Sequence, residues 1–286
     1  MSINKKIRAV VTDLDGTLLN HMHTVSDFSC NTIKALADTD VTFMIATGRH
    51  HSDARKIREK LGISAYIIAA NGATVLSPEN EIVHQAEFET DIARAILGTE
   101  VPKGVYKNIY QGDHWMVEEI DKVFEDYYTD GAFKYTLVKF EEQLHLPINK
   151  VFFTTKDASL LIPIEQKIRS EFGDYADVTF SMPQCLEIMP KGTNKGRALK
   201  STLSKLGIDI QESVAFGDGM NDFEMLSMVG TGYLMENANE MLKISLPNNP
   251  RVGHHSEDAV AKKIIDLLEL KTKKDNKDTK DPLSIS

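Results

Sequence analysis

Four short apolar segments, each ending in small or polar residues, constrain most strongly how this chain can fold. They are IRAVVTDLD, VTFMIATGR, AYIIAANGA and SVAFGDGMND, which begin at Ile7, Val41, Ala65 and Ser213. Segments of helical period separate them: Leu199, Leu203 and Leu206 fall on one face of a stretch that Gly207 closes. Continuously apolar strands that alternate with helices predict an α/β fold, a doubly wound parallel sheet covered on both faces.

The middle of the chain has a different pattern, in which strand-like and helical segments mix. YKNIYQGDHWMVEE is typical of a hairpin with Gly112 and Asp113 at its turn, and NKVFFTT and DVTFSMPQCLEIM are further strand candidates. Helical period is found around Val117–Tyr128 and Ile162–Phe172. This mixture predicts an α+β unit inserted into the α/β core. We expect a core of residues 1–86 and 188–270, an inserted domain of 87–187, and a disordered polar tail of 271–286.

Composition and charge favour a soluble globular protein over a nucleic-acid-binding or membrane-spanning one. The 286 residues are 42% hydrophobic and 26% charged, as in soluble globular proteins. The 33 basic and 42 acidic residues give a formal charge of −9, which argues against nucleic-acid binding. Cys30 and Cys185 are too few for a disulfide framework, and no apolar run approaches the roughly 18 residues that span a bilayer. We expect a cytoplasmic protein, a monomer or weak homodimer, that binds neither nucleic acid nor membranes.

The polar residues that close the apolar segments form the candidate site. In sheets of this kind ligands bind beyond the carboxyl ends of the strands, and all four segments carry their polar residues at that end. Asp13 and Asp15 stand two positions apart, so in an extended chain they lie on one side; Asp218 closes the fourth segment. Three carboxylates with neither Cys nor His among them suit Mg²⁺, which also takes substrate phosphate oxygens.

Groups that bind anions accompany these carboxylates. Thr47 offers a hydroxyl at a strand-to-helix turn. Lys191 and Lys195 stand among glycines just before a helix, and of the two we favour Lys195. Asn221 and Asp222 belong to the glycine-rich turn GDGMND. A cation site beside hydroxyl, amide and ammonium donors indicates phosphoryl transfer.

The motifs DLDGT, ATGR, NKG and GDGMND resemble, in this order, the four motifs of the haloacid dehalogenase-like phosphatases. The insertion after the second motif is similar to the Cof-type branch, which carries an α/β cap at that point. ATGRHH, KVFFT, CLEIM and AFGDGMNDFEMLSM are most similar to the bacterial pyridoxal phosphate phosphatases of this branch, which also act on sugar phosphates. The resemblance covers Ile7 to about Leu270 and implies a Rossmann-like core with an inserted cap. Ala259 stands where many relatives have Gly, a departure confined to the last helix.

The resemblance also implies a role for each motif residue. Asp13 becomes the nucleophile that forms an aspartyl-phosphate, and Asp15 the general acid and then the base for water. The remaining residues would hold Mg²⁺ (Asp13, Asp218 and the backbone carbonyl of Asp15), neutralise charge (Lys195), bind phosphoryl oxygens (Thr47, Gly48, Asn221) or lie near the substrate (Arg49, Asn71). Asp222 either reaches the metal through a water or only orients Lys195 or its own loop.

The expected function is Mg²⁺-dependent hydrolysis of small phosphate monoesters, namely pyridoxal 5′-phosphate, sugar phosphates or both. A phosphomutase of the same superfamily is one alternative. A phospho-accepting receiver domain is another, although Asp15 and the inserted domain argue against it. Specificity should come from the insert, where Tyr110, His114 and Trp115 either reach the substrate or form the insert's own core.

Overall fold

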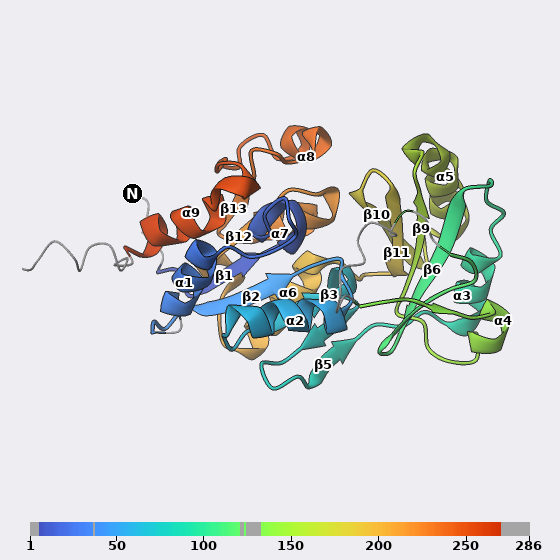
Figure 1. Ribbon diagram of the computed structural model, residues 1–286, viewed down its shortest axis with the longest axis horizontal. Helices are drawn as coiled ribbons and strands as arrows, with labels where there is room; N and C mark the ends of the chain where they lie inside the picture. The colour runs from blue at the N-terminus through green and yellow to red at the C-terminus, as the bar shows by residue number, and fades with distance from the viewer. Residues whose placement is uncertain (1–5, 37, 121–122, 124–132, 270–286) are drawn as a thin grey trace, which may run out of the picture.

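The computed structural model describes residues 6–36, 38–120, 123 and 133–269. Its larger sheet, which we call the core sheet, has the strand order β13-β12-β1-β2-β3-β4-β5 (Figure 1). The strands are β1 (Ala9–Thr12), β2 (Thr42–Ala46), β3 (Tyr66–Ala69), β4 (Thr74–Leu76), β5 (Ile82–Gln85), β12 (Ser213–Gly217) and β13 (Thr231–Leu234). All neighbours from β13 to β3 pair in parallel, whereas β4 and β5 add an antiparallel edge. The predicted parallel sheet is confirmed, and the antiparallel edge is an addition to it.

Helices cover both faces of the core sheet. One face, with Val10 and Phe216, packs against α1, α2 and α9. The opposite face, with Val11 and Ala215, packs against α6, α7 and α8. These helices are α1 (Asp27–Leu36), α2 (His51–Leu61), α6 (Lys195–Lys205), α7 (Phe223–Met228), α8 (Glu240–Ser245) and α9 (Ala259–Leu268). Burial on both sides explains why the central strands are continuously apolar in sequence.

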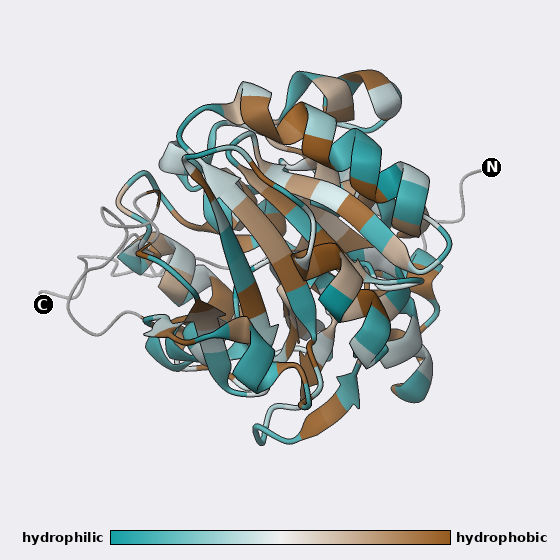
Figure 2. Ribbon diagram, turned by 90° about the vertical axis from the view of Figure 1, so that its right-hand side faces the viewer, coloured by the Kyte–Doolittle hydropathy of each residue, from teal (hydrophilic) through white to brown (hydrophobic). Residues whose placement is uncertain are grey.

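A second sheet, which we call the cap sheet, has the order β10-β11-β9-β6-β7-β8. Its elements are α3 (Thr90–Leu97), β6 (Val105–Gln111), β7 (His114–Val117), β8 (Thr136–Leu137), α4 (Phe140–Gln143), β9 (Lys150–Thr155), α5 (Leu161–Phe172), β10 (Ala176–Met182) and β11 (Cys185–Pro190). Neighbouring strands are antiparallel except β7 and β8. Helices α3 and α5 cover one face, and in Figure 2, which looks onto this end of the molecule, apolar and polar residues alternate along the ribbons. The opposite face contributes Tyr110 and Phe152 to a cluster with Ala70 and Ala73 of the core.

The predictions for the middle of the chain have different outcomes. The hairpin is confirmed, since β6 and β7 pair on either side of Gly112 and Asp113, and α5 confirms the helix at Ile162–Phe172. The helix expected from Val117 is wrong at its start, because Val117 is paired with Asn108 and so continues the ladder. Residues 121–122, 124–128 and the tail 271–286 lie outside the described residues. The domain boundaries stay a prediction; the second lies within β11, which continues to Pro190.

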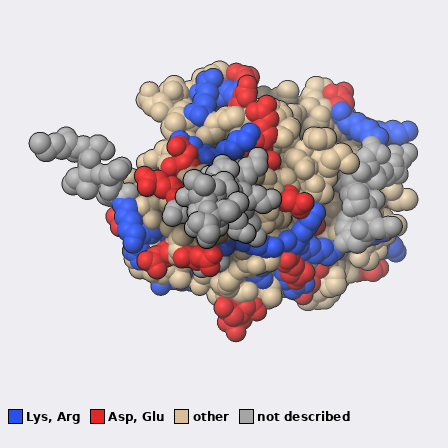
Figure 3. Space-filling view, turned by 60° about the vertical axis from the view of Figure 1, so that its left-hand side comes forward, with Lys and Arg blue, Asp and Glu red and all other residues tan. Residues whose placement is uncertain are grey.

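The surface carries charges of both signs. On the face drawn in Figure 3, Lys and Arg side chains are interspersed with Asp and Glu side chains. Among the described helices, none combines the length and apolar character needed to cross a bilayer.

Candidate active site

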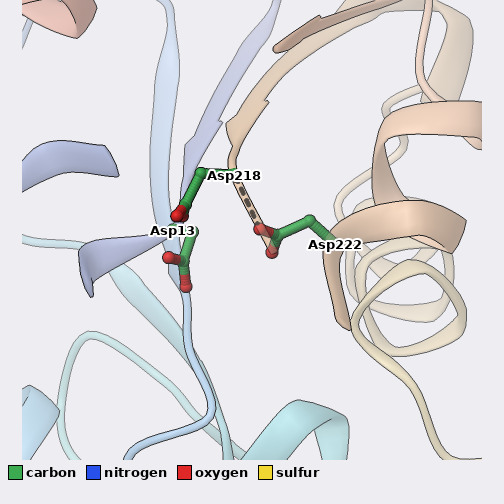
Figure 4. A group of neighbouring side chains, drawn as sticks. All are labelled: Asp13, Asp218 and Asp222. Carbon is green, nitrogen blue, oxygen red and sulfur yellow. Dashed lines mark hydrogen bonds between the residues drawn. The ribbon is translucent and has the colours of Figure 1, made fainter. Parts of the chain in front are cut away.

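Three aspartates meet where two neighbouring strands of the core sheet end. Asp13 follows β1 and Asp218 follows β12, and the Asp13 N–H donates to the Phe216 carbonyl at 3.0 Å, which holds the two strand ends together. Each of Asp13, Asp218 and Asp222 offers a carboxylate oxygen within 4.8 Å of the other two. Figure 4 shows the Asp13 and Asp218 carboxylates side by side, with Asp222 reaching toward the Asp218 backbone. The two motifs at opposite ends of the sequence therefore form one site.

Lys195 lies between two of these aspartates. It is the first residue of α6 and is completely buried, and its Nζ donates to Asp13 Oδ1 at 2.7 Å and to Asp222 Oδ1 at 2.6 Å. Burial alone would lower the pKa of Lys195, but the charges of Asp13 and Asp222 outweigh it and raise the pKa, so the ammonium form persists. Lys191 lies elsewhere, at the surface, paired with Asp177 at 3.3 Å. The structure thus places the favoured lysine, and not its neighbour, beside Asp13.

Asp222 organises the loop that carries Asp218. Its Oδ2 accepts hydrogen bonds from the N–H groups of Asp218 and Gly219 at 2.9 and 3.0 Å, while its Oδ1 accepts from Lys195. Both carboxylate oxygens of Asp222 are therefore engaged in holding the loop and the lysine. Thr17 donates to Asp218 Oδ1 at 2.9 Å from the other side.

Gly16 allows the DLDGT segment to approach Asp218 closely. Its φ is +71°, and a Cβ built on it would lie 2.3 Å from Asp218 Oδ2. A side chain at this position would therefore be strained by its backbone and would also collide with the carboxylate.

The charge balance of this cluster favours a cation. Within the part of the chain that the structure describes, these three carboxylates are accompanied by one ammonium group, that of Lys195. Burial, and then the charge of Asp222, raise the pKa of Asp218 to about 7, and burial raises the pKa of Asp13 well above its ordinary value. Buried carboxylates that lack counter-charge are compensated by a hard cation with oxygen ligands. The residues present therefore fit Mg²⁺.

Asp15 faces away from this cluster, toward Arg49. Arg49 binds it through two hydrogen bonds of 2.6 Å, from Nε and Nη2, and His23 Nδ1 lies 3.2 Å from Asp15 Oδ1. Burial would raise the pKa of Asp15, but the Arg49 charge more than offsets this and holds the pKa well below its usual range. A third contact, from Arg49 Nη1 to Asp53 at 2.6 Å, fixes the guanidinium on α2. Arg49 therefore fixes the position of the Asp15 carboxylate through these hydrogen bonds.

The predicted phosphate-binding residues lie close to one another. Thr47, Asn71 and Asn221 are all buried, and Asn221 Nδ2 donates to Asn71 Oδ1 at 3.0 Å. Asn71 has a left-handed backbone, with φ 54°, in the turn after β3. A Cβ on Gly48 would lie 3.2 Å from Asn71 Oδ1, so Gly48 lies against the same amide. The second motif, the turn after β3 and the fourth motif therefore converge.

Two charged residues of the cap sheet contact Gly48 and Asn71, and the sequence motifs did not indicate them. Lys150 of β9 and Glu187 of β11 form a buried ion pair. Lys150 Nζ also donates to the Gly48 carbonyl at 2.9 Å, and Glu187 accepts a hydrogen bond from Asn71 Nδ2. A usable signal was present: Glu187 is a charged residue inside the otherwise apolar strand CLEIM, and such a residue needs a partner when buried.

The aromatic residues of the hairpin lie mostly in packing contacts. Tyr110 and Trp115 are buried in the cluster that joins the two sheets, whereas His114 is exposed. Trp115 Nε1 donates to Asn108 Oδ1 at 2.8 Å. The ring of His50 stacks on Phe133, with centroids 4.3 Å apart, and makes an edge contact with Tyr110. Tyr110 and Trp115 are thus packed where the two sheets meet, and a substrate contact by the hairpin residues stays a prediction.

Comparison with known proteins places the chain in a family. The model of the haloacid dehalogenase-like hydrolases matches residues 10–264. A protein of Shigella flexneri named HMP-PP phosphatase is 32% identical over 254 residues, which cover 89% of this chain and 93% of the relative. A haloacid dehalogenase-like hydrolase of Bacteroides thetaiotaomicron superposes with a TM-score of 0.75 at 25% identity, over 92% of this chain and all of that one. A Streptococcus mutans structure shares the fold with a TM-score of 0.83 at 21% identity, over 92% and 100% of the chains. The chain therefore belongs to the haloacid dehalogenase-like hydrolases, and it is an enzyme.

Proposed function

We propose that the protein is a Mg²⁺-dependent phosphatase that hydrolyses small phosphate monoesters, pyridoxal 5′-phosphate or sugar phosphates or both, through an aspartyl-phosphate on Asp13. One observation carries the proposal. The Asp13 carboxylate lies at the carboxyl ends of the core-sheet strands, close to Asp218 and to the buried ammonium of Lys195. Relatives named HMP-PP phosphatases, at about one third identity, support a phosphate ester as the substrate.

The reaction has two displacements at phosphorus. In the first, an oxygen of Asp13 attacks the phosphorus, the bond to the ester oxygen breaks, and Asp15 gives a proton to the departing alkoxide. In the second, Asp15 takes a proton from water, the water oxygen attacks, and the bond from phosphorus to Asp13 breaks to release phosphate. Splitting the hydrolysis in this way replaces one difficult step with two easier ones.

Each further residue of the site acts by charge or orientation. Asp13, Asp218 and the Asp15 carbonyl would hold Mg²⁺, which supplies positive charge beside the phosphoryl oxygens. Because both oxygens of Asp222 are engaged, we assign it to orienting Lys195 and the Asp218 loop. Thr47, Gly48 and Asn221 would bind the phosphoryl oxygens.

A phosphate-release screen tests the proposal. Purified protein is incubated with Mg²⁺ and pyridoxal 5′-phosphate, hexose phosphates or nucleotides, and inorganic phosphate is measured. We expect release from at least one of the first two classes without any added sugar bisphosphate. Release that depends on a bisphosphate activator would indicate a phosphomutase instead, and activity on nucleotides alone would refute the substrate class.

A further inference from the structure

The ion pair of Lys150 and Glu187 lies where the cap sheet meets the phosphate-binding side of the site. The two side chains are 1% and 4% exposed, respectively. Lys150 Nζ lies 5.0 Å from the centre of the Tyr110 ring and 4.9 Å from that of Phe152, so the ammonium is enclosed by aromatic faces. Lys150 Nζ also contacts the Glu187 carboxylate and the Gly48 carbonyl. The lysine therefore pairs with Glu187 at a buried position.

A carboxylate at this position determines the orientation of the amides beyond it. An ionised carboxylate only accepts hydrogen bonds. Oε1 of Glu187 accepts from Lys150 and from the Cys185 thiol at 3.7 Å, and Oε2 accepts from Asn71 Nδ2. Asn71 must therefore turn its NH₂ group toward Glu187.

The orientation of Asn71 is passed to the fourth motif. With its NH₂ group held by Glu187, Asn71 presents Oδ1 to Asn221, whose Nδ2 donates to it at 3.0 Å. The reverse orientation of Asn221 would exchange the N–H and the oxygen that this side chain offers to a phosphoryl group. A neutral partner at position 187 that both donates and accepts would allow both orientations.

We propose that Glu187, held by Lys150, is a positioning residue for the phosphoryl site: it orients Asn71 and, through it, Asn221. The cap sheet then orders the phosphate-binding side of the core in addition to covering it. This inference rests on the proposed function in one respect, the binding of phosphoryl oxygens by Asn221.

The first test is Glu187→Gln, which keeps the shape of the side chain and removes its charge. Because the phosphoryl group is common to all substrates, kcat/KM should fall by about 10- to 100-fold on both p-nitrophenyl phosphate and glucose 6-phosphate. The dissociation constant for inorganic phosphate, measured by calorimetry, should rise in the same variant. Glu165→Gln on α5 is the matched control, since this cap carboxylate contacts Arg169 at 2.9 Å and not the core, and it should behave as wild type. A loss confined to glucose 6-phosphate would mean that Glu187 recognises the leaving group, and the positioning role would be refuted.

A double-mutant cycle with Asn221→Ala tests the route of the effect. If Glu187 acts through Asn221, the Gln substitution should have little further effect on kcat/KM once Asn221 is absent. Losses that simply multiply would show that the two residues act independently and would overturn the inference.

A third variant separates positioning from folding. Lys150→Met combined with Glu187→Leu replaces the buried pair by apolar side chains, which often preserves stability. We expect a thermal unfolding midpoint close to wild type, with kcat/KM still low. Recovery of wild-type kcat/KM together with the midpoint would reduce the pair to a structural role. Failure of the proposed function itself is seen separately, as absence of turnover by the wild type, and phosphate binding then still decides the inference.

Discussion

Asp13 and Asp15 stand two positions apart in the chain, yet their surroundings shift their pKa values in opposite directions. Asp13 is buried among carboxylates beside Lys195, and burial raises its pKa, whereas the Arg49 fork holds the pKa of Asp15 well below its usual range. Pairs of carboxylates whose environments push their pKa values apart are typical of sites that divide one reaction between two acids. Without a cation these shifts favour a protonated Asp13 and an ionised Asp15, so the proposed roles require a bound cation that restores the Asp13 carboxylate.

Removal of the charge on Asp13 tests the nucleophile. Asp13→Asn keeps the size of the side chain and removes the attacking oxyanion, so kcat with Mg²⁺ should fall by several orders of magnitude. The measurement is phosphate release under single-turnover and steady-state conditions, with circular dichroism as the control for folding. Wild-type turnover in a folded variant would exclude Asp13 as the nucleophile.

Asp15→Asn tests the general acid and base. The Arg49 contact keeps Asp15 as a carboxylate, the form that activates water, so protonation of the leaving group requires Asp15 to leave Arg49. Turnover should fall strongly for an alkyl phosphate and less for p-nitrophenyl phosphate, whose leaving group needs no proton, because general acid help contributes about 10²–10⁴-fold. The phospho-enzyme should also persist longer in acid-quenched samples. An equal loss on both substrates without trapped intermediate would leave Asp15 as a metal ligand only.

At the scale of elements, the N-terminus of α2 contacts the turn between β6 and β7. His50 Nε2 donates to the Gly112 carbonyl at 2.8 Å, and its Nδ1 accepts from the Ser52 N–H, so this buried ring is neutral. His51 Nε2 lies 2.7 Å from Asp113 Oδ1. These contacts join the core to the cap hairpin.

The buried His50 makes stability depend on pH. Burial, and then the charge of His51, lower the pKa of His50 to about 3, against about 6.5 in the unfolded chain. Between these values the unfolded state binds more protons, so the free energy of unfolding falls as the pH falls, by up to about 1.4 kcal/mol per pH unit from this group. His50→Asn keeps a capping side chain but does not titrate. Denaturant unfolding at pH 6.5, 5.5 and 4.5 should show a shallower loss in the variant, by about 2 kcal/mol over the range. An equal loss of unfolding free energy in wild type and variant would show that His50 does not cause the pH dependence.

At the scale of the whole molecule, the aspartate cluster joins segments from both ends of the sequence, and a cation bound there would stabilise the entire fold. Ligand at 100 times its dissociation constant adds about 2.7 kcal/mol to the stability. For a chain of this size we expect Mg²⁺ to raise the unfolding midpoint by about 5–10 °C, and EDTA to reverse this and abolish turnover. Asp218→Asn is the matched variant, and its midpoint should respond far less. Full activity in excess chelator would refute the metal assignment.

Local pattern was enough to predict the core strands, the hairpin at Gly112 and helix α5, because alternation and apolar period are properties of neighbouring residues. It failed at Val117, where pairing with Asn108 across the hairpin extends a strand into a segment of helical period. Local pattern also did not indicate β4 and β5, because these short strands form through antiparallel pairing at the edge of the sheet.

The sequence by itself predicted which residues carry the chemistry, since Asp13, Asp15, Thr47 and Asp218 stand in recognisable motifs at the ends of apolar segments. Only the tertiary structure decided their partners. Lys195 meets Asp13 across 182 positions of chain, and Glu187 meets Asn71 across 116. Such contacts depend on the order of strands in the two sheets and on how the sheets face one another. Those are properties of packing in space, which the spacing of residues along a chain does not record.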